Sequence, residues 1–242
     1  MNMKKIISLA AVLLAVLLTG CGAPAGSEAT QPQSVTDPTE AFTVSTETIP
    51  VSVGDDAVEL EEGLLVHSFR SYTGMYMEDG SDEILPRVAM VILTNNTPDD
   101  LKYAAVTVQY PGETCEYIAT NVPAGTSAVL LEQNRKLLPE EEPLSTDLSQ
   151  VLFFPEPMDA HADVFEITGM SGVMNVRNIS DTDISGDIYV YYKYSAQDLF
   201  YGGITFRICV PGGLGAGKVY QSVTAHFDPA RCTIVDIDYT AP

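Results

Sequence analysis

Leu93-Thr-Asn-Asn-Thr-Pro-Asp-Asp-Leu101 and Val176-Arg-Asn-Ile-Ser-Asp-Thr-Asp-Ile184 are two copies of one motif. In each copy an apolar run ends in Asn, Ser or Thr follows two positions later, and Asp precedes the aliphatic residue that opens the next run. Asn, Ser and Thr side chains readily bond to the backbone of their own turn. The motif therefore predicts a capped turn between two strands, once in each half of the chain.

The runs that follow the two motifs alternate between apolar and polar residues, as half-buried strands do. Successive side chains of a strand point to opposite faces, so each run offers one face to a core. The predicted core-facing residues are Ala104, Val106, Val108 and Tyr110 in the first run and Ile188, Val190, Tyr192 and Tyr194 in the second. No stretch shows a convincing helical period, so we predict an all-β protein.

A second pair of turns extends the repeat. Val122-Pro-Ala-Gly125 matches Val210-Pro-Gly-Gly213, and each follows an alternating run. Proline fixes one backbone angle and glycine permits the next to be positive, as tight turns require. Two turns that recur in the same order and at a similar spacing indicate a duplicated unit. We therefore predict two tandem β-sandwich modules, at residues 59–157 and 158–242.

The N-terminus carries a secretion signal. Lys4 and Lys5 precede an apolar run over residues 6–18 that is shorter than the roughly 20 residues of a membrane span. The following Leu18-Thr-Gly-Cys21 resembles the lipobox of bacterial lipoproteins. The resemblance implies removal of residues 1–20, a diacylglycerol thioether on Cys21, and a location on the extracytoplasmic face of the cell membrane.

Residues 21–58 form a predicted linker. From residue 22 to about residue 48 they consist mostly of Ser, Thr, Pro, Glu and Ala, with hardly any large apolar residue. Such a composition cannot bury enough surface to offset the entropy of ordering, so we predict a disordered tether between the lipid and the folded body.

The repeated pattern also resembles a known group of modules. A strand ending in Asn-x-Ser/Thr, a Val-x-Val-x-Tyr-like strand and a Pro-Gly turn are similar to the FxLYD-type and related immunoglobulin-like modules of bacterial surface lipoproteins. The resemblance implies two immunoglobulin-like β-sandwiches with an extracellular, non-catalytic role.

Charge and motifs narrow the classes of function. The formal net charge is −21, from 12 Lys and Arg against 33 Asp and Glu. A chain so poor in clustered cations is not expected to bind nucleic acid or to adhere to anionic lipid by its surface. The familiar hydrolase and phosphate-binding motifs are missing, and His67, His161 and His226 are scattered. We predict a protein without enzymatic activity and without a cofactor.

One face of the second repeated strand is a candidate binding surface. Tyr189, Tyr191 and Lys193 are predicted to point outward, where the first copy has Ala105 and Thr107. Outward tyrosines can stack on sugars or anchor a protein, which favours wall glycan or an envelope protein as partner. The alternatives are that tyrosine simply favours strands, or that these rings cover the boundary between the modules.

A calcium loop is a weaker alternative for the second motif. Asp181, Asp183 and Asp187 provide alternating oxygen ligands around Gly186. Tyr192, however, stands where such a loop needs a bidentate Glu, which favours a plain turn rich in aspartate.

Three cysteines remain besides Cys21. Cys209 and Cys232 form a candidate disulfide, because each lies at the end of a strand-like run in the same half of the chain. Small buried thiols are the favoured state for these two and for Cys115.

Taken together, these features predict a lipid-anchored cell-surface protein with a non-catalytic binding or structural role. A solute-binding lipoprotein that serves a transporter is the main alternative, and a deep pocket between the modules would favour it. A calcium-dependent surface module and a hydrolase are further alternatives.

Overall fold

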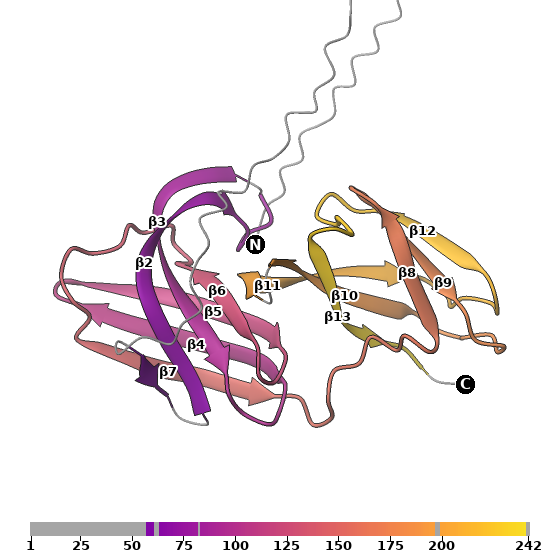
Figure 1. Cartoon of the computed structure of the whole chain (residues 1–242), viewed down its shortest axis with the longest axis horizontal. Helices are drawn as coiled ribbons and strands as arrows, with labels where there is room; N and C mark the ends of the chain where they lie inside the picture. Colours follow the sequence, from indigo (N-terminus) through magenta and orange to yellow (C-terminus); the bar gives the residue numbers. More distant parts are fainter. Residues whose placement is uncertain (1–56, 61–62, 82, 197–198, 241–242) are drawn as a thin grey trace, which may run out of the picture. The chain divides into compact units, whose positions relative to one another are not determined.

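The computed structural model describes residues 57–60, 63–81, 83–196 and 199–240; the predicted leader, Cys21 and most of the predicted linker lie outside them. The described chain consists of strands joined by turns, so the prediction of an all-β protein is confirmed (Figure 1). The strands are β1 (Val58–Glu59), β2 (Leu64–Tyr76), β3 (Glu83–Asn95), β4 (Leu101–Tyr110), β5 (Glu113–Val122), β6 (Ser127–Leu131), β7 (Ser145–Phe153), β8 (Phe165–Met170), β9 (Val173–Asn178), β10 (Ile188–Ala196), β11 (Leu199–Val210), β12 (Val219–Val223) and β13 (Cys232–Asp238).

One order of strand pairing occurs twice. In the first half, β2-β3-β6 forms one set of strands and β5-β4-β7 the other; in the second half, β8-β9-β12 and β11-β10-β13 correspond to them. Each half encloses an apolar core between its two sets, as in a β-sandwich. The pairing thus follows the internal repeat seen in the sequence.

The two halves share one sheet. β6 and β11 pair in parallel, with Ser127 opposite Leu199 and Val129 opposite Tyr201, and this pairing creates a seven-stranded sheet, β1-β2-β3-β6-β11-β10-β13. Phe200, from the second half, is buried in the core of the first half. The division into two modules stays a prediction, because a continuous sheet crosses their proposed boundary.

The faces that the alternation assigned to the core are buried. Ala104, Val106, Val108 and Tyr110 of β4 lie in the first core, and Ile188, Val190 and Tyr192 of β10 lie in the second. Tyr194 is half-buried. The register of β10 against β11 shifts between Tyr192 and Tyr194, so the alternation does not continue unchanged to the end of the strand.

The repeated motif forms the same hydrogen-bonded turn in both halves. Asn95 donates from Nδ2 to the carbonyl oxygens of Asp99 (3.0 Å) and Val122 (3.0 Å), and its Oδ1 accepts bonds from the backbone N–H and hydroxyl of Thr97. Asn178 repeats this pattern with Thr182 (2.8 Å), Leu214 (2.9 Å) and Ser180. Both asparagines are fully buried, and their amides are fully bonded.

The backbone bonds of the two asparagines show that the predicted match of residues 122–125 with residues 210–213 is wrong. The carbonyl of Asn95 accepts the N–H of Gly125, and the carbonyl of Asn178 accepts that of Gly217. The true counterpart of Val122-Pro-Ala-Gly125 is therefore Leu214-Gly-Ala-Gly217, and not Val210-Pro-Gly-Gly213. Gly125 and Gly217 both have a positive φ, of 73° and 69°, which explains why this position needs glycine. A Pro-Gly pair also occurs in an unrelated turn, so it does not identify the equivalent turn of the second half.

Replacing either buried asparagine should destabilise the protein. Asn95→Ala or Asn178→Ala leaves buried carbonyl groups without donors, and we expect each change to lower the free energy of unfolding by about 2 to 4 kcal/mol. Denaturant titration measures the loss. Asn96→Ala, at the exposed neighbouring position, is the control and should change stability by less than about 0.5 kcal/mol. Equal effects at residues 95 and 96 would contradict the structural role of the motif.

Candidate functional site

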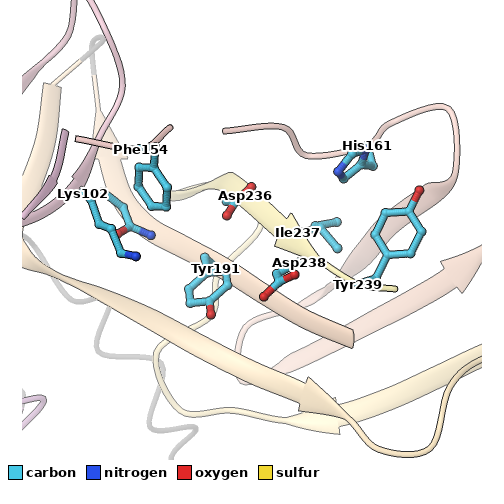
Figure 2. A pocket seen from close by; sticks show the side chains of 9 residues that line it. Lys102, Phe154, His161, Tyr191, Asp236, Ile237, Asp238 and Tyr239 are labelled. Carbon is cyan, nitrogen blue, oxygen red and sulfur yellow. The ribbon is translucent and has the colours of Figure 1, made fainter. Parts of the chain in front are cut away.

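A pocket of about 390 Å³ lies where residues of both halves meet (Figure 2). Its walls combine aromatic rings with both signs of charge. Figure 2 shows Lys102 and Phe154 at one end, His161 and Tyr239 at the other, and Tyr191 with Asp238 between them. The full lining is Lys102, Asn121, Phe154, His161, Tyr191, Asp236, Ile237, Asp238 and Tyr239.

Strand ends and strand faces bring these side chains together. Lys102 is near the start of β4, and Phe154 follows β7, held by a bond from its N–H to the carbonyl of Asp100 (2.9 Å). Tyr191 of β10 is the direct partner of Asp236 on β13. The pocket thus depends on β10 and β13 of the second half facing the ends of β4 and β7 of the first.

Two lining residues have an unusual backbone. Asn121 and His161 have φ values of 48° and 46°, a left-handed conformation that non-glycine residues seldom adopt. The turn at His161 is held by Asp159, whose Oδ1 accepts the His161 N–H at 2.7 Å. The ring of His161 meets the edge of Tyr239, with centroids 5.0 Å apart. Asn and His adopt this conformation more readily than most other residues.

The two carboxylates of the pocket differ in their surroundings. Asp236 is half-buried and accepts the N–H of Asp159 at 3.1 Å. Burial raises the pKa of Asp236; the Asp159 N–H opposes this shift and the neighbouring Asp238 adds to it. Asp238 is exposed, and among the described residues it has no ion-pair partner. The pocket therefore offers one carboxylate engaged in structure and one open to a ligand.

The predicted tyrosine face divides into two parts. Tyr191 lines the pocket and packs against the first-half core. Tyr189 lies outside the pocket lining; its hydroxyl donates to Asp187 (3.4 Å), and the guanidinium of Arg207 lies 4.9 Å from its ring centroid. The ring of Tyr191 thus lies at the boundary between the two halves, the position that one of the alternatives predicted.

Lys193 is not on an exposed surface, contrary to the prediction. The side chain is fully buried, because this part of β10 faces β5 of the first half instead of solvent. Its ammonium group donates to the carbonyl oxygens of Thr120 (2.9 Å), Gly203 (3.2 Å) and Ile204 (2.7 Å). Lys193 therefore holds the two halves together and does not line the pocket.

Glu78 also lies where the two halves join, at the parallel strands β6 and β11, which we call the junction. It follows β2, and its carboxylate accepts backbone N–H groups from Leu131 of β6 (2.9 Å) and from Gly203 (2.9 Å) and Ile204 (3.2 Å) of β11. These strands are the parallel pair that joins the halves. One half-buried anion thus accepts the N–H groups of the two strands, and one fully buried cation donates to carbonyl groups of β5 and β11.

Burial shifts the titration of both groups away from their charged forms. It lowers the pKa of Lys193 from 10.5 to about 7, and the charge of Glu78 opposes this shift. Burial also raises the pKa of Glu78 above 4.5, against the effect of the N–H donors of Gly203 and Leu131. The oxygen acceptors around Lys193 nevertheless match the donors of an ammonium group, so the junction accommodates the charged amine.

The candidate calcium ligands do not converge. Asp183 accepts the N–H of Ala216 at 2.8 Å, and Asp187 accepts that of Gly212 at 2.8 Å. These carboxylates fasten two different turns. Among the described residues, His, Cys, Asp and Glu form no group of three or more that could hold a metal ion, so Asp181, Asp183 and Asp187 are not brought together as ligands.

The candidate disulfide is not formed. Cys209 pairs with Tyr189 on one side of β10, and Cys232 pairs with Tyr194 on the other. Residues on either side of an intervening strand are about 10 Å apart, beyond the roughly 7 Å between Cα atoms that a disulfide permits. Cys115, Cys209 and Cys232 are free thiols, and burial raises the pKa of Cys232 to about 11.

The three histidines occupy separate environments. His67 is buried in β2 and contacts the hydroxyls of Ser68 and Thr94, His161 lines the pocket, and the ring of His226 stacks on Phe206.

Across the described ranges, no helix has the length and apolar character needed to cross a membrane.

Sequence reasoning missed most of the pocket. Lys102, Phe154 and Tyr239 lie on segments far apart in sequence, and only the joined sheet brings them together. One signal was available: Asp236 and Asp238 alternate with the buried Val235 and Ile237, which assigns both carboxylates to the outer face of a strand.

Removing the buried cation should weaken the junction. Lys193→Met leaves three carbonyl groups without their donor and Glu78 without its counter-charge, so we expect the free energy of unfolding to fall by about 3 to 5 kcal/mol at neutral pH. Lys218→Met, at an exposed position, is the control and should change stability by less than about 0.5 kcal/mol.

Wild type and Lys193→Met also provide a test of the pKa of Lys193. Since this pKa is about 7 in the folded protein and 10.5 ordinarily, the unfolded chain binds more protons between these values. Stability from Lys193 therefore increases as the pH rises from 7 toward 10.5. Denaturant titrations at several pH values should show the difference between wild type and Lys193→Met growing with pH. A constant or shrinking difference would contradict the lowered pKa.

Comparison with known proteins adds no relative: no protein-family model, curated protein or solved structure matches the chain.

Proposed function

We propose that the protein is a lipid-anchored, non-catalytic binding protein of the bacterial envelope, held at the extracytoplasmic face by a diacylglycerol group on Cys21. The pocket between β4, β7, β10 and β13 is its binding site. Its partner is wall material or an envelope protein. The anchor is supported by the lipobox-like Leu18-Thr-Gly-Cys21, and the binding role by the pocket.

The observation that carries the binding role is the lining of the pocket. Tyr191, Phe154 and Tyr239 supply aromatic surface, and Lys102 and Asp238 supply exposed charge of opposite sign. Binding sites typically combine apolar walls with a few polar groups that orient the ligand. The bonds of Lys193 to β5 and β11 hold β10, the strand that also carries Tyr191.

A solute-binding lipoprotein that serves a transporter is the second candidate. The pocket favours it, because residues of both halves line an open hollow whose volume suits a small molecule. Under this proposal the linker would hold the folded body near a membrane partner, and the ligand would be soluble.

Tyr191 and Tyr189 form a matched pair for testing the site. Tyr191→Ser removes a ring from the pocket lining, and we expect retention on purified wall material, or affinity for a captured solute, to fall about 10-fold. Tyr189→Ser removes a neighbouring ring outside the lining and should leave binding unchanged. Tyr191→Phe keeps the ring and should retain most of the binding, which separates loss of the contact from loss of folding.

The two outcomes differ clearly. An equal loss of binding in Tyr189→Ser and Tyr191→Ser would show that the binding surface lies outside the pocket. Full binding by both variants would contradict the proposed binding site.

The anchor is tested separately. Cys21→Ala removes the thiol that would carry the lipid, so we expect the protein to move from the membrane fraction to the soluble exported fraction. Cys115→Ala is the control and should stay with the membrane. Metabolic labelling with a lipid precursor should mark wild type and not Cys21→Ala. Membrane attachment of an unlabelled protein would contradict the proposal.

A further inference from the structure

We propose that the pocket binds a small zwitterion, with the ligand's carboxylate at Lys102 and its ammonium at Asp238. Short peptides with free termini, and single amino acids, have this chemistry. The inference rests on the proposed function, because it names the ligand class of the same pocket.

Lys102 provides a cation at one end of the pocket. Its Nζ lies 5.4 Å from the centroid of the Phe154 ring, which orients the side chain. The residue is exposed, and among the described residues it has no ion-pair partner. An anionic group of a ligand can therefore bind it without displacing a carboxylate of the protein.

Asp238 provides the opposite charge. In Figure 2 the ring of Tyr191 lies between Lys102 and Asp238, so the two charges stand on either side of an aromatic surface. A ligand that carries both charges can lie against this ring and meet one group at each end. Asp236, next to Asp238 on the same face of β13, is engaged by the Asp159 N–H and adds negative potential at the ammonium end.

The balance of charge favours a zwitterion over simpler ions. The net charge of the chain is −21, which repels simple anions from the molecule as a whole. Lys102 repels a purely cationic ligand at one end of the site. A molecule with both charges avoids both penalties, and the pocket, about 390 Å³, is at the small end of the range for ligand sites.

The experiment measures binding of blocked and free peptides to the full chain in detergent by titration calorimetry. The probes are alanine, dialanine and trialanine with free termini, and trialanine that is acetylated, amidated or both. We expect a free peptide to bind, and blocking either terminus to weaken binding about 10-fold or more, because each block removes one charge-assisted contact.

Two variants identify the residue at each end. In Lys102→Gln, amidation of the peptide should no longer matter, while acetylation still weakens binding. In Asp238→Asn the pattern should be reversed. Lys218→Gln and Asp181→Asn change exposed charges outside the pocket lining and should behave like wild type. Competition with soluble wall fragments then distinguishes free peptides from peptide ends carried by the wall.

Each result has a defined meaning. Equal binding of free and doubly blocked peptide, tighter binding of a diamine, or no binding of any zwitterion would overturn this inference. If an oligosaccharide or diamine binds and Tyr191→Ser abolishes that binding, the proposed function stands and only the ligand class is wrong. If Tyr191→Ser affects no probe and no wall material, the proposed function itself fails.

Discussion

The parallel pairing of β6 with β11 is the constraint on which the rest of the structure depends. It turns two sets of strands into one sheet, and it carries β10 and β13 to the ends of β4 and β7, where the pocket forms. Hydrogen bonds in a parallel ladder do not by themselves select one register. Side-chain bonds add to this ladder: Glu78 accepts N–H groups from both β6 and β11, and Lys193 donates to carbonyl groups of β5 and β11. Gly203 supplies both kinds of group at the centre of this junction.

Taking charged groups out of water is an expensive way to hold the two halves together, since each ion loses part of its hydration. An apolar contact would have been less costly. Around Lys193 and Glu78, each charged group instead meets several backbone groups of opposite polarity. Gly203 shows how close the approach is, because a Cβ atom there would collide with the carbonyl of Ile118. Such precision suits a pocket whose walls come from both halves.

Much of the local structure could be predicted from sequence, because it depends on neighbours along the chain. The alternation at residues 104–110 and the Asn-x-Ser/Thr turns correctly indicated strands, core faces and caps. The environment of Lys193 could not be predicted, since alternation specifies a face and says nothing of what covers it. The same limit applies to the pocket, whose lining joins Lys102 to Asp238 through a long-range pairing. The match of Val210-Pro-Gly-Gly213 to the first turn was wrong because Pro-Gly pairs suit many turns.

The passage of β11 into the first half has a consequence for any attempt to divide the molecule. Phe200 lies in the core of the first half, and Leu199 belongs to the apolar cluster on the other side of the same sheet. If the chain were cut after Pro157, the first fragment would have an unpaired edge at β6. The second would expose the apolar start of β11. Each fragment would expose a ready template for aggregation. The two halves repeat one order of strand pairing, yet neither half keeps its sheet and its core intact without the strand pairing that joins them.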